Sequence, residues 1–231
     1  MFKIALDAGH GLKTAGKRCL KKIDKNETRE WTLNSRICDK IEEKLKVYDG
    51  YSLLRVDDTT GKTDIALSKR CKAANNFKAD LYLSIHHNAG IKGGSGGGIV
   101  VYTWEKPDAE LKEWQKLVYN NLIDETGLKG NRATPLAKSN FYVLVNTNMQ
   151  AILVENGFMD STKDTPIILT DDFADQAATA YVKTLVKIGG LKKKQTKYKV
   201  TATKTVSSKE KAEAEAAALE NDGYTVTYTK C

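Results

Sequence analysis

Three histidines occur in this chain of 231 residues, and two of them are adjacent. His86 and His87 directly follow Leu81–Ile85, a largely apolar run typical of a buried strand that ends in a polar loop. Because successive side chains of a strand point to opposite faces, only one of these two imidazoles can reach a given site. Strand geometry alone does not choose between them.

The third histidine and one glutamate also follow short apolar runs. Phe2–Leu6 leads into the segment 7–11, Asp-Ala-Gly-His-Gly, whose two glycines predict a tight loop that exposes His10 just past a strand. Ala151–Val154 leads into Glu155 and a glycine turn in the same way. Each pattern alone is also typical of an ordinary turn.

A second glutamate lies at the start of a predicted helix. An apolar stripe with a four-residue spacing predicts this helix over 27–47, and its members are Leu33, Ile37, Ile41 and Leu45. Glu30 extends the stripe into the first turn, so its carboxylate needs a positive partner, for which a metal ion is one candidate. The ordinary alternative is an acid favoured at a helix N-terminus, which Glu27 fits better because it lies off the stripe.

Predicted strands and helices alternate along residues 1–190. Strands are expected at 2–6, 51–56, 81–85, 99–102 and 151–154, and helices at 27–47, 64–76, 108–125 and 173–188. This order predicts an α/β fold with a mostly parallel, twisted sheet flanked by helices. Ligands of such sheets bind outside the carboxyl ends of the strands, where His10, His86 and Glu155 all fall.

Two histidines and one glutamate with an open fourth position form a known catalytic zinc set. Zinc lowers the pKa of bound water to about 7 and polarises a carbonyl group. A second carboxylate that does not bind the metal can take the proton of the water and pass it to a leaving amine. His10, Glu30 and His86 together with Glu155 would fill these roles. The helical His-Glu-x-x-His pattern of metalloproteases is absent from the sequence.

Four ordered motifs resemble the zinc-dependent N-acetylmuramoyl-L-alanine amidases. They are Asp-x-Gly-His-Gly at 7–11, Glu-x-x-apolar-Asn-x-x-Ile at 30–37, Ser-Ile-His-x-Asn-Ala at 84–89 and Leu-Val-Glu-x-Gly-Phe at 153–158. The resemblance covers about residues 1–188 and implies an amidase catalytic domain there. It departs at Met149-Gln150, where the family usually has Met-Pro.

The resemblance also implies residue roles. His10, Glu30 and His86 are expected to bind Zn²⁺, which selects Glu30 over Glu27, and Glu155 is expected to be the catalytic carboxylate. The implied reaction is hydrolysis, by a zinc-activated water, of the amide between N-acetylmuramic acid and L-alanine of the stem peptide.

Three further residues receive weaker expectations. His87 falls at a variable position of its motif, so it is expected either to touch substrate or to face solvent. Asn88 and Arg132 are predicted to bind substrate.

Composition limits the class and the partners of the protein. Apolar residues make up 41% and charged residues 29%, which is ordinary for a soluble globular chain. No apolar run approaches the roughly 20 residues of a membrane helix, and the N-terminus lacks the features of a signal peptide. Cys19, Cys38, Cys71 and Cys231 are scattered, which favours free buried thiols over disulfides or a cysteine metal site.

The net charge of +8 favours acidic partners. About half of the excess lies in the last forty residues, where nine Lys and five acidic residues occur without Arg. Nucleic acid, an anionic membrane and an anionic wall polymer are the candidates, and nucleic-acid binding usually interleaves aromatic residues with Arg, which is absent here. Peptidoglycan is the partner that the resemblance implies, and adhesion to anionic wall polymers is the role that the basic segment suggests. A solubilising linker is the alternative.

The C-terminal part is predicted to be separate. Residues 189–197 have the composition of a basic linker, and 198–231 predict a small β-α-β appendage with strands at 198–203 and 224–228 around a helix at 208–221. This segment resembles half of the sporulation-related repeat domain, which binds glycan strands of cell walls. So small a unit cannot easily bury its own face, which favours a homodimer or a composite wall-binding module over a lone appendage packed on the amidase domain.

The sequence therefore predicts a peptidoglycan hydrolase. Made in the cytoplasm without a signal peptide, it would be a phage endolysin that reaches the wall by holin-type release, or a host autolysin acting at mother-cell lysis. The alternative class is a non-catalytic wall-binding protein on the same fold. Such a protein is expected to lack a metal ligand or Glu155, and none of these residues is missing.

Overall fold

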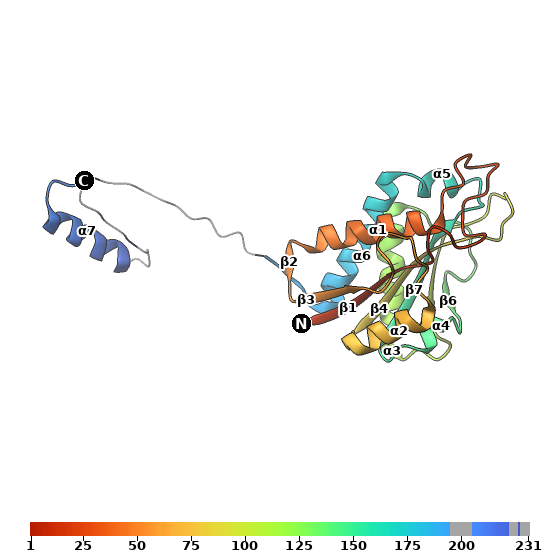
Figure 1. Ribbon diagram of the computed structural model, residues 1–231, viewed down its shortest axis with the longest axis horizontal. Helices are drawn as coiled ribbons and strands as arrows, with labels where there is room; N and C mark the ends of the chain where they lie inside the picture. The colour runs from red at the N-terminus through yellow and green to blue at the C-terminus, as the bar shows by residue number, and fades with distance from the viewer. Residues whose placement is uncertain (195–204, 222–225, 227–231) are drawn as a thin grey trace. The chain divides into compact units, whose positions relative to one another are not determined.

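The computed structural model describes residues 1–194, 205–221 and 226 (Figure 1). These residues belong to two compact units, Met1–Lys194 and Gln195–Cys231. Each unit is described by itself.

A six-stranded sheet forms the centre of the first unit. Its strands, in spatial order, are β3 Tyr51–Arg55, β1 Phe2–Ala8, β4 Leu81–Asn88, β7 Gln150–Phe158, β5 Ile99–Thr103 and β6 Leu136–Lys138. The first four are parallel, β5 runs antiparallel to β7, and β6 is parallel to β5. The predicted mostly parallel α/β fold is confirmed.

Helices cover both faces of the sheet. The larger core lies under α1 Glu30–Leu45, α3 Ala109–Thr126 and α6 Asp171–Gly189. The smaller core lies under α2 Leu67–Phe77 and the single turn α4 Tyr142–Val145, on the opposite side of the sheet from α1 and α6 (Figure 1). A further single turn, α5 Thr165–Ile168, precedes α6. Alternation along β4 sends Leu81, Leu83 and Ile85 into the larger core and Tyr82 into the smaller one.

The start of α1 separates the two candidate glutamates. Glu30 is the first residue of the helix and is buried, whereas Glu27 lies in the preceding loop with φ 49°. The carboxylate of Glu27 lies 3.2 Å from Nε of Arg18. Glu27 therefore belongs to a loop ion pair, and Glu30 is the acid that faces the interior.

The first residues of the predicted linker, 189–194, belong to the first unit. α6 continues to Gly189, Gly190 follows as its C-cap with φ 61°, and Leu191 is buried in the larger core. Lys192–Lys193 then form β8, which pairs antiparallel with β2 Tyr48–Asp49. The apolar side chain of Leu191 holds this segment against the first unit, so residues 189–194 are part of that unit.

In the second unit the structure describes α7 Lys209–Asn221, in agreement with the helix predicted at 208–221. The strands predicted at 198–203 and 224–228 lie outside the described residues, except for Val226.

Candidate metal centre and active site

The three predicted metal ligands come together at the carboxyl ends of β1 and β4. Nε2 of His10 lies 3.4 Å from Oε1 of Glu30, and Nδ1 of His86 lies 3.0 Å from the same oxygen. One ligand atom from each residue falls within 4.8 Å of the others. The side chains of His10 and His86 are 20% and 15% exposed, so the cluster opens to solvent on one side.

The donor set and its spacing fit a zinc ion. Tetrahedral bonds of about 2.0–2.2 Å place neighbouring ligand atoms about 3.3 Å apart, close to both observed separations. Oε2 of Glu30 is buried without a hydrogen-bond partner among the described residues. Burial opposes the charge of Glu30, but hydrogen bonds with His10 and His86 outweigh it and lower the pKa of the carboxyl. A buried anion between two imidazoles is an arrangement that a divalent cation satisfies.

Glu155 lies beside this cluster on β7. It is directly opposite His86 in the register of β4 and β7, so both side chains project from the same face of the sheet. Burial raises the pKa of Glu155 to about 7, with the charge of His86 opposing and that of Glu30 reinforcing the shift. Its Oε2 atom is buried and has no hydrogen-bond partner among the described residues. A carboxyl with this pKa can both hold and release a proton near neutral pH.

A strained loop presents His10. The residue adopts φ 68°, a left-handed conformation that costs a non-glycine residue of order 1–3 kcal/mol. Gly9 precedes it because the backbone passes against the ring of His86, where a Cβ atom would lie 2.0 Å from Cε1. Nδ2 of Asn34 donates a 3.0 Å hydrogen bond to the carbonyl of Gly9. The glycine before His10 is thus required by close approach and not by turn geometry alone.

His87 neither faces solvent nor lies on the side of the sheet that carries His86 and Glu155, so both expectations for it are wrong. Its ring is 2% exposed and lies on the opposite face of β4, 6.5 Å from the ring of Phe173 between centroids. Nδ1 lies 2.7 Å from Oδ1 of Asn34. Burial lowers the pKa of His87 to about 3, so the ring is neutral at physiological pH.

The two predicted substrate-binding residues lie outside the metal cluster. Oδ1 of Asn88 accepts a hydrogen bond from the backbone N–H of Ala89, and the guanidinium of Arg132 lies 5.2 Å from the ring centroid of Phe158. Both influence Tyr102 on β5: burial and the charge of Glu155 raise the pKa of this phenol, and Arg132 and Asn88 oppose the shift. Sequence patterns did not single out Tyr102, whose place near Glu155 follows from the antiparallel pairing of β5 with β7.

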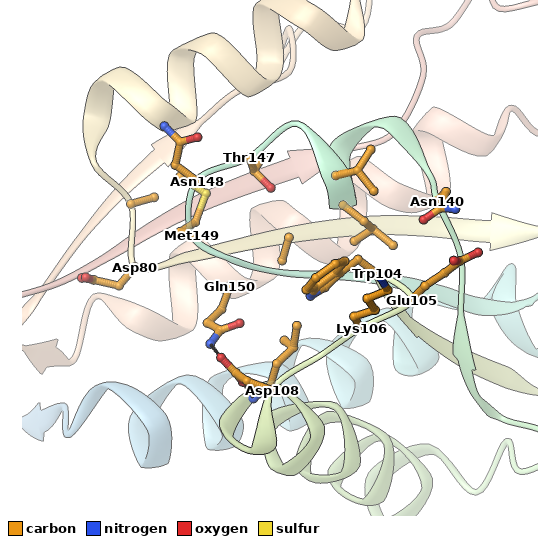
Figure 2. Close-up of a pocket in the computed structure, with 15 residues that line it drawn as sticks. Asp80, Trp104, Glu105, Lys106, Asp108, Asn140, Thr147, Asn148, Met149 and Gln150 are labelled. Atoms are coloured by element: carbon orange, nitrogen blue, oxygen red, sulfur yellow. Dashed lines mark hydrogen bonds between the residues drawn. The ribbon is translucent and has the colours of Figure 1, made fainter.

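A groove of about 890 Å³ lies elsewhere, where β4 and β7 begin (Figure 2). Its lining includes Asp80, Trp104, Asp108, Met149 and Gln150 and contains no histidine. Nε2 of Gln150 donates a 2.8 Å hydrogen bond to Oδ2 of Asp108, the N-cap residue of α3. Gln150, which stands where the amidases usually have Pro, therefore lies at the opposite end of the strands from the metal cluster. There its side-chain amide links β7 to α3.

Comparisons with known proteins agree with this fold. The family model of the N-acetylmuramoyl-L-alanine amidases matches residues 4–187, and the chain belongs to this family. The sporulation-specific N-acetylmuramoyl-L-alanine amidase of Bacillus subtilis (strain 168) is 32% identical over 194 residues, which cover 84% of this chain and 70% of that protein. The endolysin of Bacillus phage SPP1 is 30% identical over 196 residues, covering 82% of this chain and 66% of the endolysin.

A solved structure extends the agreement to three dimensions. The N-acetylmuramoyl-L-alanine amidase of Clostridium difficile 630 superposes with a TM-score of 0.72 at 27% identity, covering 80% of this chain and 95% of that one. The predicted class, a peptidoglycan amidase, is confirmed. Among the helices that the structure describes, none is long and apolar enough to cross a membrane.

Proposed function

We propose that this amidase is zinc-dependent, that His10, Glu30 and His86 hold the ion, and that Glu155 is the catalytic carboxylate. The observation that carries the proposal is the meeting of two imidazoles and a buried carboxylate within 4.8 Å, beside a second buried carboxyl on the next strand. Membership of the amidase family supports the bond cleaved, which is the amide between N-acetylmuramic acid and L-alanine.

Each residue of the site has a distinct role in this proposal. Zinc would lower the pKa of a water molecule to about 7 and polarise the carbonyl of the scissile amide. Glu30 stays anionic, because His10 and His86 hold its pKa low, and it supplies the negative charge of the ligand set. Glu155, with a pKa of about 7, accepts the proton of the attacking water and donates it to the leaving amine of L-alanine.

The test is the variant Glu155→Gln, which keeps the size of the side chain and removes its proton chemistry. We expect zinc content equal to that of the parent and a fall in hydrolysis of about 10²–10⁴-fold. Zinc is measured by elemental mass spectrometry, and hydrolysis by L-alanine amino termini released from purified cell walls. Glu27→Gln is the matched control, since Glu27 pairs with Arg18 in a loop and should leave both quantities unchanged.

Two results would refute the proposal. If the parent protein carries no zinc after purification and binds none on titration, the proposed zinc dependence is refuted. If Glu155→Gln cleaves walls as fast as the parent, the proposed catalytic role of Glu155 is refuted.

For the second unit we propose binding to peptidoglycan or anionic wall polymers, with a homodimer as the form that buries its exposed face. The support is the resemblance of residues 198–231 to half of the sporulation-related repeat domain, which binds glycan strands of cell walls, and the basic run Lys192–Lys194 that directly precedes the unit. Cosedimentation with purified walls should be weaker for a chain that ends at Lys194 than for the full chain, and light scattering of the full chain should give the mass of a dimer. Equal cosedimentation and a monomer mass would refute both parts.

The biological setting is a further proposal. Relatives include a phage endolysin and a sporulation amidase, so release through a holin and mother-cell lysis are both compatible with the chain. Expression of the chain in a bacterial cytoplasm with and without a holin tests the first route: we expect lysis only when the holin is present, and lysis without the holin would refute it.

A further inference from the structure

One buried arginine outside the metal cluster has every hydrogen-bond donor occupied. Arg70 on α2 is 1% exposed. Its Nε donates to the carbonyl of Ile65 at 2.7 Å, Nη1 to that of Ala8 at 2.8 Å and Nη2 to that of His10 at 2.9 Å. Nη1 also pairs with Asp7, and Nη2 lies 3.0 Å from Oδ1 of Asp64. A guanidinium has five N–H donors in a rigid plane, and five acceptors surround this one.

Asp7 connects the arginine to the strand that carries His86. Asp7 is 1% exposed, and its Oδ2 accepts hydrogen bonds from the hydroxyls of Tyr82 at 2.9 Å and Ser84 at 2.7 Å. Both donors are on β4, on the same face as His86. Burial opposes the charge of Asp7, yet Arg70 and the hydrogen bonds lower the pKa of its carboxyl, so the pair is ionic.

The backbone carbonyl groups of Ala8, Gly9 and His10, at the strained loop, all accept hydrogen bonds from side chains. Arg70 bonds the carbonyls of Ala8 and His10, and Asn34 bonds that of Gly9 between them. The left-handed conformation of His10 persists only if its surroundings fix it. These three contacts fix the backbone on both sides of the imidazole.

We propose that Arg70 and Asp7 are positioning residues of the metal centre, which set the separation between His10 on its loop and His86 on β4. The inference rests on the proposed function, since it assumes that these histidines bind zinc. Neither residue touches the three ligand atoms; they act through the backbone of the loop and through the neighbours of His86.

The decisive variant is Arg70→Lys, which keeps the charge but has one nitrogen where the guanidinium has three. We expect the zinc dissociation constant to rise about 10–100-fold, the range seen when partners of metal ligands are removed. It is measured by competition with a chelator, at a temperature where circular dichroism shows the variant to be folded. The visible absorption spectrum of the Co²⁺-loaded protein should also change, because it reports the arrangement of the ligands.

Arg55→Lys is the matched control. Arg55 on β3 is also enclosed, with its side chain 7% exposed, and it pairs with Asp39, Glu42 and Asp57, which lie outside the metal cluster. The same chemical change there should lower the melting temperature and leave the zinc dissociation constant and the Co²⁺ spectrum unchanged. Should Arg70→Lys fail to fold, Ser84→Ala removes a single hydrogen bond to Asp7 and should weaken zinc binding to a smaller extent.

The outcomes separate this inference from the proposed function. If the parent binds zinc and Arg70→Lys, or Ser84→Ala in its place, binds it as tightly with the same Co²⁺ spectrum, Arg70 and Asp7 serve stability alone and the inference is overturned. If the parent binds no zinc, the proposed function fails, and the inference falls with it.

Discussion

The two adjacent histidines of β4 have opposite surroundings. His86 lies at the solvent-facing carboxyl end of the central strand β4, against Glu30. The hydrogen bond with Glu30 raises the pKa of the ring despite burial. His87 lies in the larger core against Asn34 and Phe173, and burial, reinforced by the charges of His86 and Arg36, lowers its pKa to about 3. Glu30 and Asn34 are one turn apart on α1, so a single helix serves both rings. The face of the strand, and not the residue type, decides whether an imidazole joins the candidate metal site or supports the core.

The largest effect is expected from substitution of His86, the histidine of the candidate metal site. His86→Ala removes one of the three proposed zinc ligands, so bound zinc and wall hydrolysis should both fall to background. Elemental mass spectrometry of the purified variant and clearing of a wall suspension measure them. Retention of one zinc per chain by His86→Ala would show that another residue takes the ligand position.

Substitution of His87, the histidine of the core, should change the stability of the protein and not its zinc content. His87→Ala leaves a cavity and removes the hydrogen-bond partner of Oδ1 of Asn34, so the free energy of unfolding should fall by about 2–4 kcal/mol, as for other large-to-small core substitutions. Urea unfolding measures it. Zinc content should remain close to that of the parent, and loss of zinc from the folded variant would mean that the two histidines do not have separate roles.

The next effect concerns pH. In the unfolded chain His87 binds a proton below about pH 6.5, whereas in the folded chain it stays neutral to about pH 3. The unfolded state therefore binds more protons between these values, and this group makes the protein less stable as pH falls, by up to about 1.4 kcal/mol per pH unit.

His87→Gln isolates that contribution. Its free energy of unfolding should decline less steeply than that of the parent from pH 6.5 to pH 4, measured in urea with chelator present in both samples. Parallel curves would show that His87 is not buried as a neutral ring.

The smallest effect is expected from Lys17, an exposed residue beside the candidate metal site. Nζ of Lys17 is 3.7 Å from Oε2 of Glu30, and the lysine side chain is 46% exposed. Exposed ion pairs contribute about 0.2–1 kcal/mol, so Lys17→Met should tighten zinc binding by at most about fivefold, since the ion no longer competes with a cation. Lys13→Met in the same exposed loop is the control. Weaker zinc binding in Lys17→Met would show that the lysine helps to hold the ligand.

The main features of the fold and site could be predicted because they depend on local patterns. Apolar runs locate the strands, and their carboxyl ends locate His10, His86 and Glu155, which the structure brings together. The position of Glu30 at the first turn of α1 follows from the apolar stripe of that helix.

What could not be predicted depends on contacts between distant segments. Arg70 shares the buried face of α2 with Cys71 and Ala74, but an arginine is expected to be exposed unless a partner such as Asp7 is known. The burial of His87 requires the position of Phe173 on α6, and strand alternation supplies only the face. Gly-Gly and Lys predicted a linker at 189–197, where one leucine, Leu191, packs into the core.

The cysteines of the first unit have a consequence for the surroundings in which it can work. Cys19, Cys38 and Cys71 are free and buried, as predicted, and burial raises the pKa of Cys19 to about 12 and that of Cys71 to about 11. Oxidants attack the thiolate form, which is scarce at such pKa values, and the candidate ligands are nitrogen and oxygen atoms. This unit therefore combines a candidate metal site free of thiol ligands with protected thiols, and we expect it to withstand peroxide and oxygen without any disulfide among these three cysteines.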